Sequence, residues 1–214
     1  EATMAIIMHI NYCEQGQSLS EAAAKAVAWG FDGVEFRGVN PRRGQSDEEY
    51  LDELERAVET AGLKTVILGG PGPNFVAESQ AERDRELEAA VRFYERAALR
   101  FDLGVCNILL GRITNPAPGV GPKEAMKHGS YAAGDEHWEW VVAKTRQLCR
   151  AVAERGITLA AETHGGFLHD SLASSIRLVD AVDEPNFALT FDYGNMYRLA
   201  DTPSLPERSE EHTS

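Results

Sequence analysis

The chain has 214 residues, of which 43% are hydrophobic and 26% charged, a composition typical of folded globular proteins rather than of disordered chains. A formal net charge of −13 disfavours nucleic acid as a partner, because binding a polyanion depends on Lys and Arg neutralising phosphates. No apolar run approaches the roughly 20 residues needed to span a bilayer, so we expect no membrane partner.

The composition does not shift along the chain, which predicts a single domain over residues 1–207. The last seven residues, 208–214, read RSEEHTS and continue no earlier pattern. A widely used sequencing adapter encodes this heptapeptide in one reading frame, so we expect a non-native tail rather than the alternative, an ordinary disordered C-terminus. An independent genomic clone that encodes the same tail followed by a stop codon would contradict this expectation.

Short apolar runs alternate with amphipathic segments along the chain. The runs predict six strands, at residues 4–10, 33–37, 65–68, 105–110, 157–161 and 187–191. The amphipathic segments predict helices at 18–28, 46–62, 79–102, from about 138 to 156, and 171–182. Three of them begin with a Ser followed three residues later by Glu, as in a capping box: Ser18, Ser46 and Ser79.

Strands that are apolar on both faces, each followed by a helix, predict an α/β fold with a parallel sheet. A doubly wound sheet would carry a Gly-rich fingerprint after the first strand, and residues 11–16 do not match it. A (β/α)₈ barrel instead places polar chemistry at the carboxyl ends of several strands, where this chain has His9, Glu35, Asn107, Glu162 and Asp192. We therefore predict a TIM-type (β/α)₈ barrel that is incomplete, with about six βα units.

Glu162 and Asp192 follow the fifth and sixth apolar runs directly. A carboxylate at the end of a buried run needs a partner, and neighbouring parallel strands lie only about 4.8 Å apart. The pair predicts a divalent-metal site suited to Mg²⁺ or Mn²⁺, and a nearby His164 would widen the choice to Co²⁺ or Zn²⁺. The alternative is that both carboxylates make structural ion pairs or cap the following loops.

The stretches GFDGVE at 30–35, ETHGG at 162–166 and DYGN at 192–195 resemble the xylose isomerase-like TIM barrels. The resemblance implies that Glu162 is a metal ligand and a catalytic carboxylate and that Asp192 is a second metal ligand. It also implies that Glu35, His164 and Asn195 line the substrate site. The remaining ligands of that family, a His and a Glu, come from seventh and eighth strands that this sequence does not contain.

The resemblance implies a metal-dependent isomerase or epimerase of a sugar or polyol, acting by enediolate proton transfer with Mn²⁺, Mg²⁺ or Co²⁺ in preference to Zn²⁺. We expect residues 1–214 alone to turn over little, because half of the ligand set is missing; robust metal-dependent epimerisation would contradict this. Two alternatives stay open: an inosose dehydratase or keto-acid lyase of the same family, and a non-catalytic sugar-binding barrel. Endonuclease activity is disfavoured by the charge and the few histidines.

Weaker candidates are spread over the chain. The long loop 112–134 is either a substrate lid, with Arg112, Lys123, Lys127 or His128 contributing, or a plain excursion. His9 and Cys13 are interpreted as core residues rather than pocket residues, Trp138 as core, and Trp140 as facing solvent or another subunit. Three widely spaced cysteines indicate no disulfide framework and fit a cytoplasmic location; a homo-oligomer stays open.

Overall fold

The computed structural model describes residues 4–9, 16–37, 44–69, 72–121 and 124–196. These residues contain one six-stranded sheet, and every strand pairs in parallel with the strand before it, in the order β1-β2-β3-β4-β5-β6. The strands are β1 (Ile7–His9), β2 (Gly33–Arg37), β3 (Thr65–Gly69), β4 (Val105–Ile108), β5 (Thr158–Glu162) and β6 (Phe187–Thr190). Sequential parallel pairing of this kind is the arrangement of a βα-barrel, and the described sheet has six of the eight strands that a complete barrel contains.

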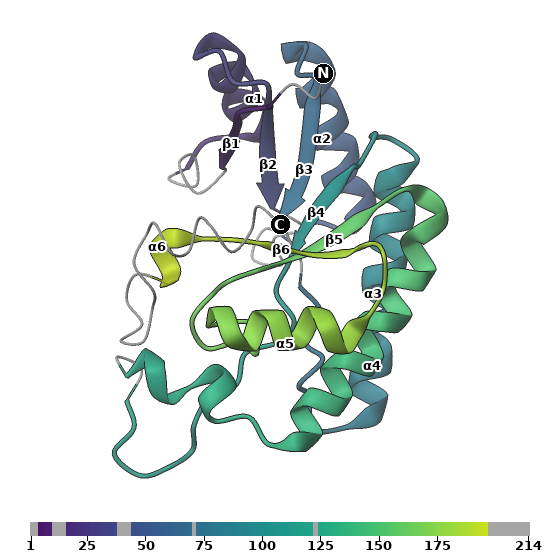
Figure 1. Ribbon diagram of the computed structural model, residues 1–214. Coiled ribbons are helices and arrows are strands. Elements are labelled where there is room, and N and C mark those ends of the chain that lie inside the picture. Colours follow the sequence, from purple (N-terminus) through teal and green to yellow (C-terminus); the bar gives the residue numbers. More distant parts are fainter. Residues whose placement is uncertain (1–3, 10–15, 38–43, 70–71, 122–123, 197–214) are drawn as a thin grey trace.

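Helices connect the strands and cover one face of the sheet. They are α1 (Leu19–Ala28), α2 (Asp47–Ala61), α3 (Gln80–Ala98), α4 (Asp135–Val152) and α5 (Leu172–Val182). A single helical turn, α6 (Tyr193–Met196), follows β6, and short 3₁₀ turns lie at Ala125–Lys127, Gly129–Tyr131 and Ala153–Arg155. In Figure 1 the strand direction turns from steep at β1–β3 to nearly horizontal at β6, as expected of a strongly twisted sheet.

The helix starts follow the sequence prediction closely. Ser18 and Ser46 each accept a hydrogen bond from the backbone N–H three residues on, and the carboxylates of Glu21 and Glu49 accept one from the backbone N–H of the cap residue. Helix α2 ends at Gly62, whose φ of 68° lies in the left-handed region that glycine adopts without strain. Helix α3 ends at Ala98 and not at residue 102 as predicted.

The first predicted strand was too long. Within residues 4–9 only Ile7–His9 pair with β2, while Met4 and Ile6 are 84% and 55% exposed. The apolar run indicates a buried strand, but before Ile7 the described chain is held to the rest of the sheet only by the hydrogen bonds between Ile6 and Asp32, and its side chains are exposed. Strands β4 and β6 are also shorter than predicted, by two residues and one residue.

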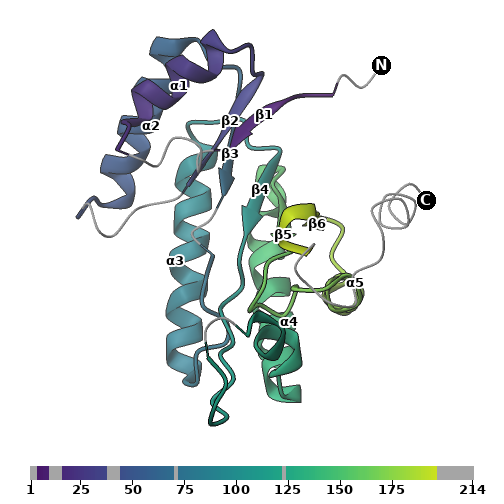
Figure 2. The ribbon, with the colours of Figure 1, turned by 90° about the vertical axis from the view of Figure 1, so that its left-hand side faces the viewer.

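The core lies between the sheet and its helices. Phe36, Leu68, Ile108 and Leu159, on four adjacent strands, are fully or almost fully buried there. Helices α1, α2 and α3 lie on the same side of strands β1–β4 (Figure 2). On the outer surface the guanidinium of Arg100 contacts the carboxylates of Glu48 and Asp52 at 2.8 and 2.6 Å, which ties α3 to α2. No helix among the described residues has the length and apolarity needed to cross a membrane.

Candidate functional site

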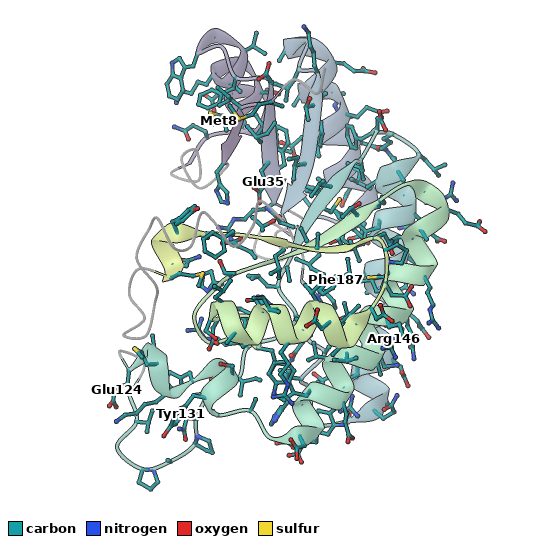
Figure 3. All side chains as sticks on the ribbon, viewed as in Figure 1. Met8, Glu35, Glu124, Tyr131, Arg146 and Phe187 are labelled. Atoms are coloured by element: carbon teal, nitrogen blue, oxygen red, sulfur yellow. The ribbon has the colours of Figure 1, made fainter. Side chains whose placement is uncertain are left out.

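The strand register places polar side chains together at the carboxyl edge of the sheet. His9 at the end of β1 is the register partner of Glu35 in β2, and Glu162 at the end of β5 is the partner of Thr190 in β6. His9 Nε2 lies 3.6 Å from Glu35 Oε1. Figure 3 shows Glu35 near the end of β2, where the strands converge. The prediction that His9 is a core residue was wrong, because its side chain is 43% exposed beside Glu35.

Gly69, at the end of β3, leaves the space that the Glu35 carboxylate occupies. A Cβ at this position would lie 2.3 Å from Glu35 Oε1, far inside van der Waals contact. Any other residue at position 69 would therefore displace the Glu35 carboxylate. The glycine at the end of β3 thus sets the position of a carboxylate on β2.

Glu162 is the last residue of β5 and is half-buried. Burial raises the pKa of its carboxyl above the usual value, the carboxylates of Asp192 and Glu35 raise it further, and His164 and His9 oppose the rise. Asn195 Nδ2 donates a hydrogen bond of 3.2 Å to Glu162 Oε1. A carboxyl with a raised pKa that holds a fixed position is suited to proton transfer near neutral pH.

Asp192 caps the helical turn α6. Its Oδ1 accepts hydrogen bonds from the backbone N–H groups of Gly194 at 2.7 Å and Asn195 at 3.1 Å. Its Oδ2 accepts from Asn195 Nδ2 at 2.7 Å, so a single amide group links Asp192 to Glu162. Capping was the alternative interpretation of this residue, and the geometry is that of a cap. A carboxylate oxygen with one such bond still has a lone pair for a cation.

Three side chains of the site have the spacing of a metal centre. Among the described residues, one ligand atom each from His9, Glu35 and Glu162 lie within 4.8 Å of one another. Two ligands on opposite sides of one ion are about 4–4.5 Å apart, so a small movement would let this trio bind a divalent cation. Asp192 is not in the trio and approaches it only through Asn195. The donors are oxygen and imidazole nitrogen, a set that suits Mn²⁺, Co²⁺ and Zn²⁺.

His164 and His169 lie in the loop after β5. The sequence interpretation did not single out His169. The Nδ1 of His164 lies 3.2 Å from the carbonyl oxygen of Gly165, and its ring meets Phe167 edge-on at 5.3 Å. His169 is fully buried, its ring stacks on Phe167 with a centroid distance of 5.5 Å, and its Nδ1 contacts the backbone carbonyl of Glu162. The sequence around His169 contains no pattern that distinguishes a buried histidine from a surface one, so its burial could not be predicted.

The long loop after β4 is attached to the loop after β5. Ile113 donates its backbone N–H to Gly166 O at 2.9 Å, and Ser130 donates to Asp170 Oδ2 at 3.0 Å. In Figure 3 Glu124 and Tyr131, both in this loop, lie well away from Glu35. The described part of the loop is thus a packed excursion. Within it, His128 is buried and bonds to Asn115, Lys127 pairs with Glu124, and Lys123 lies outside the described residues, as does Cys13.

Each of the two tryptophans of α4 has an arginine guanidinium over its ring. Trp138 is buried, as predicted, and the Arg177 guanidinium lies over its ring at 3.8 Å. Trp140 is partly covered by the guanidinium of Arg83 at 4.0 Å. One face of Trp140 therefore packs on α3, and the side chain remains partly exposed.

A family model described as xylose isomerase-like TIM barrel matches residues 23–212. The chain belongs to this family. The match contains all three stretches on which the sequence resemblance was based, and it agrees with the sequential parallel sheet. A search of curated protein sequences finds no significant match.

Solved structures support the same fold for this xylose isomerase-like barrel. D-psicose 3-epimerase with D-tagatose from Clostridium cellulolyticum H10 superposes with a TM-score of 0.70 at 18% identity, covering 94% of this chain and 67% of that one. The 3-keto-D-glucoside 4-epimerase of E. coli gives 0.69 at 17%, covering 94% and 72%. The probable 3-DHS dehydratase of Bacillus anthracis gives 0.65 at 18%, covering 91% and 65%. The chain thus spans about two thirds of the length of these proteins.

Proposed function

We propose that the protein is a metal-dependent isomerase or epimerase acting on a sugar or sugar-like polyol, with Glu162 as the catalytic carboxylate. The observation that carries the proposal is the position of Glu162. Its carboxylate lies close to His9 and Glu35, and it also accepts a hydrogen bond from Asn195. Membership of the family and the fold shared with two sugar epimerases support it.

Glu162, Glu35 and His9 would hold the ion, and Asp192, which Asn195 links to Glu162, would be a further ligand. When bound, the ion would supply a positive charge beside a sugar carbonyl and so stabilise an enediolate. This donor set fits Mn²⁺, Mg²⁺ or Co²⁺, and Zn²⁺ less well because three of the four donors are carboxylates.

Glu162 would remove the proton from the carbon next to the carbonyl. Its raised pKa makes it a stronger base than an exposed carboxylate, and Asn195 holds one of its oxygens, leaving the other for the proton. Glu35, His164 and Asn195 would contact the sugar hydroxyls. Inversion at carbon needs a second acid on the opposite face, whereas exchange of the proton with solvent needs only Glu162.

Two measurements test the proposal. Isothermal titration with Mn²⁺ should show binding that weakens at least about tenfold in Glu162→Gln. Glu154→Gln is the matched control, because Glu154 is exposed at the opposite edge of the sheet. With Mn²⁺ in D₂O, a ketohexose such as D-tagatose should slowly gain deuterium at the carbon next to its carbonyl, and Glu162→Gln should abolish the gain. Absence of both metal binding and exchange would reject the proposal.

A dehydratase of the same family is the second candidate, supported by the fold shared with the probable 3-DHS dehydratase. The same base and ion would serve, because loss of water from a hydroxyl next to an enolate begins with the same proton removal. Mass spectrometry of the sugar after incubation distinguishes the two, since dehydration lowers its mass by one water.

A further inference from the structure

The loop after β4 carries an arginine whose surroundings are not explained by the fold. Arg112 is exposed, and no described carboxylate lies within ion-pair distance of its guanidinium. Elsewhere several surface arginines have acidic partners, as Arg96 and Arg100 do on Glu48 and Arg150 does on Glu184. In a chain of net charge −13, an arginine without such a partner at the carboxyl edge of the sheet is available to a ligand.

The backbone around Arg112 is fixed on both sides. Gly111, with a φ of 100°, has no room for a side chain, because a Cβ would lie 2.6 Å from Asn74 Oδ1. On the other side, Ile113 donates to Gly166 O at 2.9 Å and accepts from Gly129 N at 3.0 Å. Arg112 is therefore presented from a held segment rather than from a freely moving loop.

The guanidinium lies against the double glycine that follows Glu162. A Cβ at Gly166 would meet the Arg112 Nε at 3.3 Å and its Cζ and Nη2 at 3.4 Å, so the arginine covers this glycine. A Cβ at the neighbouring Gly165 would meet no atom within 4 Å. Open space therefore lies at Gly165, next in the chain to the glycine that Arg112 covers.

We propose that Arg112 binds an anionic group of the substrate, so that the site selects a phosphorylated or carboxylated sugar over a neutral one. A guanidinium offers paired N–H donors that match the oxygens of phosphate or carboxylate. The carbon backbone of the sugar would pass over Gly165, with the carbonyl end at Glu162 and the anion at Arg112. This inference rests on the proposed function, because it assigns the far end of the same substrate.

The probes are three ketoses that differ only at the sixth carbon: D-fructose, D-fructose 6-phosphate and D-fructuronate. Titration calorimetry with Mn²⁺ present should show at least one of the two anionic ketoses binding at least tenfold more tightly than D-fructose, and which of them does so tells phosphate from carboxylate. Arg112→Gln should remove this preference and leave D-fructose binding unchanged. The matched control is Arg155→Gln, an exposed arginine before β5 at the opposite edge of the sheet, which should keep the preference.

Gly165→Ala tests the path of the sugar. The added Cβ would meet no atom of the described residues within 4 Å, so the melting temperature should not change, yet all three ketoses should bind several-fold more weakly. The inference is overturned if the wild-type protein binds the three ketoses equally or binds none, if Arg112→Gln keeps the preference, or if Gly165→Ala binds like wild type. Metal binding and deuterium exchange are measured separately, so a failure of this inference can be told apart from a failure of the proposed function.

Discussion

His169 makes folding stability depend on pH in a way that can be calculated. The ring is fully buried, and desolvation lowers its pKa from 6.5 to about 4, although its bond to the Glu162 carbonyl opposes the shift. Among the described residues its Nε2 has no hydrogen-bond partner, so the folded protein keeps the ring neutral. An unfolded chain takes up the proton as pH falls through 6.5. In the folded state His169 does not take up a proton until about pH 4. The contribution of His169 to stability is therefore full above pH 6.5 and is lost as the pH falls from 6.5 to about 4.

The magnitude follows from the two pKa values. Relative to neutral pH, this one histidine should lower the free energy of unfolding by about 1.4 kcal/mol at pH 5.5 and about 2.5 kcal/mol at pH 4.5. A typical domain has only about 5–15 kcal/mol to lose, so the effect is measurable.

The assay is urea denaturation of the wild-type protein and His169→Asn at pH 7.5, 5.5 and 4.5. Asparagine can place an N–H donor where Nδ1 lies, and it does not titrate. The variant should be less stable at pH 7.5 because packing is lost, but its stability should fall by about 2.5 kcal/mol less on going to pH 4.5.

The control is Leu178→Ala, which removes buried packing from α5 without removing a titratable group. Its loss of free energy between pH 7.5 and 4.5 should match that of the wild-type protein. The reasoning about burial is refuted if His169→Asn and wild type lose the same free energy between pH 7.5 and 4.5.

Three further predictions concern other parts of the molecule. Gly69→Ala should weaken Mn²⁺ binding about tenfold while melting close to wild type, because the new methyl displaces only the flexible end of Glu35, as a Mn²⁺ titration will show. Asn186→Ala should lower the free energy of unfolding by about 2 kcal/mol in urea, since two carbonyls that Asn186 Nδ2 bonds at 2.8 and 3.1 Å would lose their donor; an unchanged midpoint would contradict this. Burial raises the pKa of Cys106 and of Cys149 to about 12, so peptide mapping after thiol labelling of the native protein should find both unmodified, and rapid labelling of either would show that it is not buried.

Local sequence signals predicted the helix starts and the strand order well. Ser18 and Ser46 cap helices through their own neighbours, so three or four residues of sequence contain the whole signal. The ends of β1 and α3 depend on what packs against them, which a local pattern does not report. For this reason Met4 and Ile6 resemble strand residues and yet are exposed.

The candidate site was predicted in part. The sequence brought out Glu162 and Asp192 because a carboxylate directly after an apolar run is unusual, and both lie at the ends of neighbouring strands, linked by Asn195. It did not predict that His9 would stand beside Glu35, since that contact depends on the register between β1 and β2. His169 was missed because its importance comes from burial alone.

The sheet order also bears on how the chain acquires its structure. Every described strand has as its partner the strand made immediately before it, so no pairing waits for a distant segment. Each βα unit that leaves the ribosome can therefore add to a sheet edge already formed, and assembly can proceed from the N-terminus during synthesis. Until the next strand arrives, the growing edge exposes unpaired N–H and C=O groups to other chains. A slow stretch of translation between two strands would prolong that exposure, and so the timing of synthesis becomes part of what keeps the protein from aggregating.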